Sequence, residues 1–164
     1  NPFAAVEIVF WLMGSLTDRS LAHVWVAAPF ILAGLALLLT TGPALDALTL
    51  GEDAAANLGI DPNRLLLTVI AGIALAVGAA SAVTGAIGFV GLIVPHLLRP
   101  LVGGEPARLL PVSALGGASL VLAADTLLRL LAPFADIKLG VVTSLIGAPF
   151  FVWLVLRNRR ELAT

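Results

Sequence analysis

Four long stretches of the chain contain no Asp, Glu, Lys or Arg, and this feature constrains the fold more than any other. The stretches cover residues 20–45, 65–98, 109–124 and 139–156, and their only ionisable side chains are His23 and His96. A helix needs about 17–25 predominantly apolar residues to cross the hydrocarbon core of a bilayer. The pattern therefore predicts an all-α, polytopic bundle of transmembrane helices and excludes a soluble globule.

Composition excludes several classes of function. Of the 164 residues, 60% are hydrophobic and 12% are charged, whereas an ordinary soluble domain has about 25% charged residues. The net charge of −1 provides no basic face for nucleic acid, and the absence of cysteine excludes disulfides and thiolate chemistry. The sequence has no Walker A lysine motif, GxSxG elbow, HExxH motif or paired intramembrane aspartates. We therefore expect a protein that is not an enzyme and has no cofactor or metal.

Five crossings are expected, at residues 21–41, 65–83, 84–101 (short and interrupted), 109–132 and 139–156. Residues 3–16 are apolar but short and include Glu7, which suits an interfacial or re-entrant helix better than a span. The chain opens with Asn in amphipathic material, with no signal-peptide pattern. We therefore interpret it as a fragment of a longer membrane protein.

The placement of Lys and Arg predicts the orientation of the chain, because cytoplasmic loops carry an excess of positive charge. Five crossings put residues 46–64, 99–108 and the tail on one side, together with Arg64, Arg99, Arg108, Arg157, Arg159 and Arg160. The opposite side has Arg19, Arg129 and Lys138. This imbalance places the C-terminus in the cytoplasm.

Residues 46–64 form the longest polar interval, and their end signals predict two short helices. Thr49 and Glu52 match a capping box, with Thr49 at the N-cap and Glu52 at N3. Gly59 is expected at the C′ position that ends this helix. Asp61 followed by Pro62 predicts a second N-cap with proline at N1. So many end signals favour a protruding segment of fixed shape over the alternative, a solvated connector.

Two features are candidates for contacts with other proteins. Leu50, Ala54 and Leu58 are spaced i, i+4, i+8 and are expected to share one face, which suits docking into a groove. Asp125 and Arg129 are spaced i, i+4 and are expected to pair. The simplest interpretation is a local ion pair near the membrane surface. The pair can also serve a contact with another protein. In that case Asp125 orients the planar guanidinium of Arg129 toward a carboxylate on the partner, and the local ion pair is kept.

The segment GAIGFVGLIVPHLLRPLVGGEP (85–106) is apolar but rich in glycine and proline, so it is either a broken crossing or an ordinary kinked span. LIGAPFF (145–151) is a similar interruption, for which close packing of the last span is the alternative. We expect helix breaks at Gly88, Gly91, Pro95, His96, Gly147 and Pro149. His96 has no second metal-ligating side chain within a turn, so we expect it to bond to backbone near a helix end rather than to a metal.

Several segments together resemble the FecCD-type permease subunits of ABC importers for iron-siderophores, haem and vitamin B12. The matching stretches are WLMGSL (11–16), LTLGEDAAANLGI (48–60), GAIGFVGLIVPHLLR (85–99), GGEPARLLPVSALGGASLVLAADTLLR (103–129) and LGVVTSLIGAPFFVWLVLRNRR (139–160). They follow the family's order and spacing over nearly the whole chain, which makes the similarity specific.

The resemblance implies a type II permease of ten helices that works as a dimer in the bacterial inner membrane. Residues 1–164 are similar to its C-terminal half, from the end of the fifth helix region through helix ten. The implied partners are a cytoplasmic ATP-binding subunit and a periplasmic or lipoprotein substrate-binding protein. The family pattern seats the following residues in the ATPase cleft: Gly51, Glu52, Ala55, Leu58 and Gly59. It aligns Arg129 with an outward arginine that meets an acidic residue of the binding protein.

One position departs from the family. Lys138 stands where relatives usually have proline before the glycine that opens the last span, so the external turn there is expected to differ. The expected function is that of an importer permease for an iron chelate, haem or cobalamin. The rival interpretation is a non-transporting or truncated membrane scaffold. An ion-driven carrier is disfavoured because Asp125 is the only candidate for a coupling carboxylate near the midplane.

Overall fold

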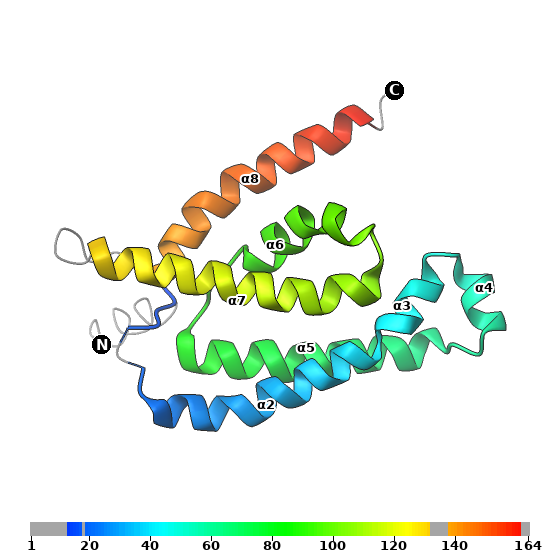
Figure 1. Cartoon of the computed structure of the whole chain (residues 1–164), viewed down its shortest axis with the longest axis horizontal. Coiled ribbons are helices and arrows are strands. Elements are labelled where there is room, and N and C mark those ends of the chain that lie inside the picture. The colour runs from blue at the N-terminus through cyan, green and yellow to red at the C-terminus, as the bar shows by residue number, and fades with distance from the viewer. Residues whose placement is uncertain (1–12, 18, 132–137, 162–164) are drawn as a thin grey trace, which may run out of the picture. The chain divides into compact units, whose positions relative to one another are not determined.

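The computed structural model describes residues 13–17, 19–131 and 138–161, and the regular structure within these ranges is entirely helical (Figure 1). The interfacial helix expected at residues 3–16 lies mostly outside the described residues. The chain forms two compact units. One contains the described residues of 18–83 and 98–114, and the other contains those of 1–17, 84–97 and 115–164.

Among the described residues, four helices are long and apolar enough to cross a membrane, as the uncharged stretches predict. They are α2 (Leu21–Thr40), α5 (Pro62–Thr84), α7 (Pro106–Leu131) and α8 (Leu139–Glu161). At 1.5 Å per residue, the 23 residues of α5 measure about 34 Å, which exceeds the hydrocarbon thickness of about 30 Å. The prediction of an all-α membrane bundle is confirmed.

The stretch between α5 and α7 is interrupted, as expected for residues 84–101. Gly85–Gly88 is not helical, α6 covers Val90–Leu98, and the short 3-10 helix η1 covers Arg99–Val102. The nine residues of α6 measure only about 14 Å. Helix α6 alone is therefore too short to cross the hydrocarbon core of about 30 Å.

In the unit of residues 18–83 and 98–114, α2 and α5 lie side by side (Figure 1). A Cβ atom on Gly34 would lie 2.6 Å from both the Gly72 carbonyl oxygen and the Ala76 amide nitrogen. The missing side chain lets the two backbones touch, which is how small residues promote helix association in lipid. Two short helices, α3 (Gly42–Leu48) and α4 (Glu52–Asn57), connect α2 to α5.

In the other unit, backbone groups near the non-helical segment have protein partners. The Ser15 amide donates a hydrogen bond to the Thr84 carbonyl at 2.8 Å, and the Gly140 amide donates one to the Gly14 carbonyl at 3.1 Å. Lipid offers no such partners, so irregular backbone at membrane depth must be satisfied by the protein itself. A Cβ atom on Gly140 would lie 2.9 Å from the Ala86 carbonyl oxygen, so this backbone packing requires glycine where α8 begins.

Candidate functional site

The two short helices predicted within residues 46–64 are only partly present. Helix α4 lies in this interval, whereas α3 mostly precedes it and the helix expected after Asp61 is the start of the long helix α5. The predicted capping box is wrong, because α4 begins after Gly51 rather than after Thr49. Thr49 ends α3 instead, and its hydroxyl donates to the Asp46 carbonyl at 2.6 Å. Gly51 has φ 106° and ψ 156°, a conformation open to glycine but costly for other residues. The turn between the helices therefore depends on Gly51.

The C-terminal end of α4 confirms the role predicted for Gly59. This residue has φ 78°, and its amide donates to the Ala56 carbonyl at 2.9 Å. The Ile60 amide donates to the Ala55 carbonyl at 3.1 Å. These two bonds make up a Schellman motif, which satisfies the carbonyl groups left open at a helix end.

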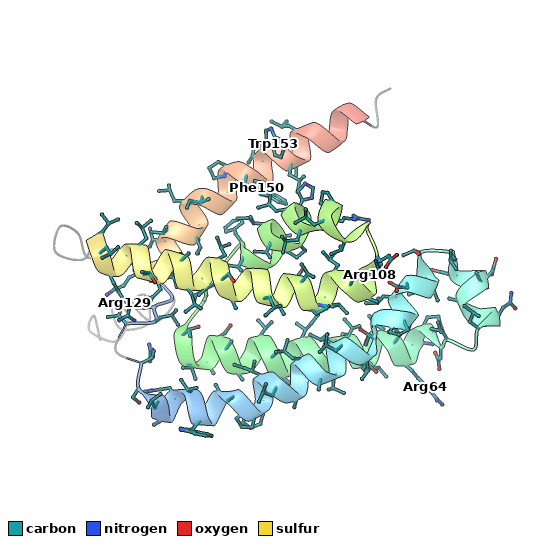
Figure 2. All side chains as sticks on the ribbon, in the orientation of Figure 1. Arg64, Arg108, Arg129, Phe150 and Trp153 are labelled. Atoms are coloured by element: carbon teal, nitrogen blue, oxygen red, sulfur yellow. The ribbon has the colours of Figure 1, made fainter. Side chains whose placement is uncertain are left out.

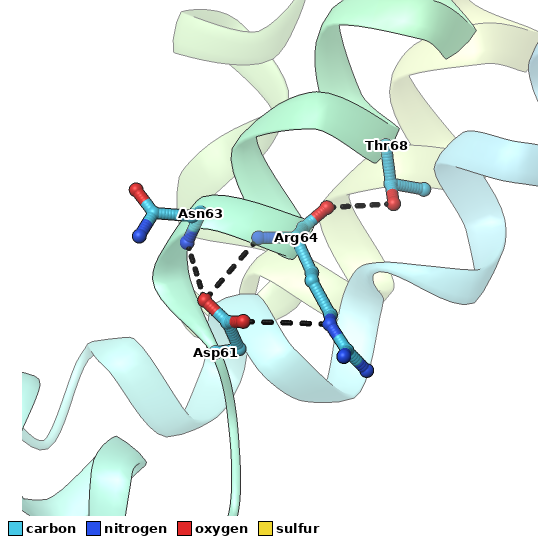
Figure 3. Close-up of polar contacts among 4 residues, drawn as sticks. All are labelled: Asp61, Asn63, Arg64 and Thr68. Carbon is cyan, nitrogen blue, oxygen red and sulfur yellow. Dashed lines mark hydrogen bonds and ion pairs between the residues drawn. The ribbon is translucent and has the colours of Figure 1, made fainter.

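The N-cap predicted at Asp61 and Pro62 is present, but it starts the long helix α5 rather than a second short helix (Figure 3). Asp61 Oδ1 accepts hydrogen bonds from the Asn63 amide at 2.9 Å and the Arg64 amide at 3.4 Å. Asp61 Oδ2 lies 3.4 Å from Arg64 Nε. The N-cap at Asp61, followed by Pro62, therefore fixes the direction in which the chain leaves the short helices.

Exposure separates the residues that can form a contact surface from those that support it. The Glu52 side chain is exposed in the first turn of α4, and Leu50 and Leu58 are 73% and 66% exposed. Ala55 is completely buried, so it supports the segment from within rather than presenting a surface. Leu50 precedes α4, so the helical spacing used to group it with Ala54 and Leu58 does not apply.

Helix α3 is held against the first turn of α7. Asp46 Oδ1 accepts a hydrogen bond from the Ala107 amide at 2.8 Å, across 61 positions of sequence. A Cβ atom on Gly42 would lie 3.0 Å from both Cα and Cβ of Ala107. The segments 46–64 and 99–108 therefore meet at Asp46 and Ala107, and the side of the membrane on which they lie stays a prediction. Sequence reasoning did not single out Asp46, and no local signal links it to α7.

The predicted pair near the other end of α7 is present. Arg129 Nε lies 2.7 Å from Asp125 Oδ2, and the two side chains are 61% and 15% exposed respectively. Arg129 belongs to the last turn of α7 (Figure 2). Because Asp125 is largely covered while Arg129 is open, the carboxylate fixes the guanidinium and leaves much of it free for further contacts. Lys138 immediately precedes α8, and residues 132–137, where the expected difference from the family would extend, lie outside the described range.

The expected helix breaks divide into two groups. Gly88 lies in the non-helical segment, and the chain turns at Phe89, a non-glycine residue with φ 66°. Gly91, Pro95 and His96 lie inside α6 rather than at a break.

The break expected in the last span is wrong, because α8 continues through Gly147 and Pro149. Gly147 has a packing role, since a Cβ atom there would overlap the Phe89 side chain. The His96 ring meets the Phe150 ring edge-on, with centroids 5.9 Å apart. Phe150 in turn lies near Trp153 along α8 (Figure 2). Within the described residues, no group of three or more His, Cys, Asp or Glu side chains forms a potential metal site.

Comparisons with known proteins agree with this architecture. Residues 1–157 match the FecCD transport family. The chain is 46% identical to the vitamin B12 import system permease protein BtuC of Vibrio cholerae over 155 residues, which cover 93% of this chain and 46% of that protein. It is 44% identical to the hemin transport system permease protein HmuU of Yersinia pestis, over 94% of this chain and 46% of the relative.

A solved structure shares the fold. A metal-chelate type ABC transporter in an inward-facing conformation aligns with a TM-score of 0.78 and 38% sequence identity, covering 92% of this chain and 49% of the solved one. The chain spans about half the length of the curated relatives that it matches. The matched residues, the helix order and the shared fold together place this chain in the FecCD transport family.

Proposed function

We propose that this chain is the C-terminal half of a permease subunit that imports an iron chelate, haem or cobalamin across the bacterial inner membrane. A separate cytoplasmic ATPase drives the transport, a substrate-binding protein delivers the cargo, and a second permease copy completes the pathway. The names of the relatives support the cargo class, because they include permeases for vitamin B12, hemin and iron(III) dicitrate.

The observation that carries the proposal is a short helical segment of defined shape between two membrane-spanning helices. Gly51, Gly59 and Asp61 define the ends of its turns, and Leu50 and Leu58 expose apolar side chains on it. An amphipathic surface on a rigid support is suited to docking in a groove of another protein. We assign this surface to the ATPase, with Glu52 and Leu58 as the principal contacts.

Opposite ends of α7 serve opposite sides of the membrane in this proposal. Ala107 and Arg129 are 22 residues apart in one helix, which corresponds to about 33 Å of rise. This distance exceeds the hydrocarbon thickness of about 30 Å. With residues 46–64 and the C-terminus in the cytoplasm, Arg129 faces the binding protein, where its fork-shaped guanidinium can bind a carboxylate.

The ATPase contact is tested by replacing Glu52 and Leu58 together with alanine in the full-length permease and measuring cargo-stimulated ATP hydrolysis by the assembled complex. We expect the stimulation to be lost. Leu101→Ala is a matched control, because Leu101 is similarly exposed, at 76%, but lies in η1 rather than in α3 or α4. Stimulation that is unchanged in the double variant contradicts the docking role.

The binding-protein contact is tested with Arg129→Glu, which we expect to weaken capture of the binding protein several-fold at low salt. Reversing the charge of the acidic partner residue should restore part of the affinity. Arg64→Glu is the matched control, because Arg64 also pairs with an aspartate at its own helix end (Figure 3) but lies on the ATPase side of the membrane in this proposal. Equal affinity for the Arg129 and Arg64 variants contradicts the assignment.

A further inference from the structure

Helix α7 begins without a capping side chain from the residue that precedes it. Pro106 is its first residue, and the carboxylate of Glu105 lies 2.8 Å from Arg108 Nε. The Ala107 amide, one of the open donors at the helix start, is satisfied by Asp46 Oδ1 at 2.8 Å. An aspartate oxygen on such an amide is the usual N-cap interaction. Here the aspartate comes from α3, so the cap joins two separate helices.

A second contact reinforces the first. Gly42 and Asp46 are spaced i, i+4, so they lie on one face of α3, and both meet Ala107. The neighbouring residues are covered as well, since Thr41 is 3% exposed and Ala47 is 8% exposed. Helix α3 is therefore seated on the first turn of α7 by a hydrogen bond and by close backbone packing.

We propose that Asp46 is a positioning residue that fixes the α3–α4 segment to α7, so that a displacement of the segment by the ATPase also moves α7. This inference rests on the proposed function. Helix α7 is continuous from Pro106 to Leu131, with Pro111 inside it, and it carries Asp125 and Arg129 near its other end. The Asp46 cap thus links the α3–α4 segment to the helix that carries the proposed binding-protein contact.

Variants of Asp46 distinguish a cap that only stabilises the fold from a contact that couples ATP hydrolysis to transport. We would compare Asp46→Ala with Asp46→Asn in the full-length permease, assembled with its ATPase in lipid nanodiscs or liposomes. The readout is the amount of cargo transported per ATP hydrolysed. Asparagine keeps the acceptor oxygen and caps as well as aspartate. For Asp46→Ala we expect about fivefold less cargo transported per ATP hydrolysed, because a lost cap typically costs ~1 kcal/mol, which corresponds to this factor. For Asp46→Asn we expect a normal ratio.

Two outcomes of that comparison overturn the proposal. A normal ratio in Asp46→Ala shows that the contact is not used in coupling. An equal loss in both variants shows that the charge of Asp46 matters rather than the cap. Loss of coupling in the Glu52 and Leu58 double variant, together with normal coupling in Asp46→Ala, refutes this inference alone. Normal coupling in the double variant refutes the proposed function itself.

A cysteine pair tests the same idea without removing Asp46, and so remains informative if Asp46→Ala does not assemble. Gly42→Cys and Ala107→Cys place two thiols at the contact, where the present spacing of Cβ positions is 3.0 Å. Disulfides span about 3.5–4.5 Å between Cβ atoms, so a shift of about half an ångström suffices. The chain has no cysteine of its own within residues 1–164. We expect the oxidised pair to keep its transport ratio, because α3 and the start of α7 move together. Inhibition that a reductant reverses overturns the proposal.

Discussion

The contact between α2 and α5 gives the most quantitative stability prediction. In Gly34→Ala, the new methyl group would lie 2.6 Å from backbone atoms of Gly72 and Ala76. Ordinary van der Waals contact begins near 3.4 Å, so the helices must separate by about 0.8 Å. Backbone atoms cannot rotate away as a side chain can. Overpacking of this kind costs about 1–3 kcal/mol.

The matched control is Gly78→Ala in α5, where a new Cβ atom meets nothing within 4 Å. Alanine favours a helix over glycine by about 1 kcal/mol, and both variants gain this amount. The difference between them therefore isolates the packing cost. The measurement is the midpoint of thermal unfolding of the full-length permease in detergent, followed by tryptophan fluorescence at one scan rate.

We expect Gly34→Ala to melt measurably below Gly78→Ala. A cost of 1 kcal/mol shifts the midpoint by about 2–4 °C in chains of 150–250 residues and by less in the longer full-length permease. If Gly34→Ala melts at the same temperature as Gly78→Ala or above it, the two helices do not touch at this position. The close packing of α2 on α5 is then wrong.

Three further substitutions test local features. Gly59→Ala should speed limited proteolysis next to α4, because a φ of 78° costs a residue with a Cβ atom about 1–2 kcal/mol. Gly59→Asn should leave the proteolysis rate unchanged, and equal rates for the two variants would contradict the Schellman turn. Asp61→Ala should destabilise the protein by about 0.5–2 kcal/mol through loss of the cap on α5, while Asp61→Asn should be neutral in thermal unfolding; a neutral alanine variant would show that the cap is not used. Gly147→Ala should lower the melting temperature because the new methyl group overlaps Phe89, and Gly91→Ala, which meets nothing within 4 Å, should not; matching temperatures would refute the packing.

Local sequence signals predicted helix ends correctly where the end is decided by contacts within a few residues. A helix starts at Asp61 and Pro62 and Gly59 ends α4, as expected, although the helix after Asp61 is the long α5 rather than a second short one. Each of these signals acts within a few residues, through a hydrogen bond or a φ angle. The signal at Thr49 failed because α3 extends up to that residue and uses its hydroxyl at its own C-terminal end. The sequence pattern alone cannot show whether a residue between two adjacent helices caps the end of the first or the start of the second.

The sequence by itself determined the class of the protein. Uncharged stretches long enough to cross a bilayer leave a chain few alternatives to helices, because backbone groups in lipid must bond within the protein. The Asp125–Arg129 pair was predictable for the same local reason, since i, i+4 residues face each other on one helix.

Only the tertiary structure decided which glycines bring helices together and which side chain caps α7. The 16 glycines look alike in sequence, but Gly34 touches a neighbouring backbone while Gly78 faces open space. The bond from Asp46 to Ala107 spans 61 positions, and no periodicity or local motif connects residues so far apart. Such contacts depend on how complete helices pack against each other, and that packing is set by the shapes of many side chains at once.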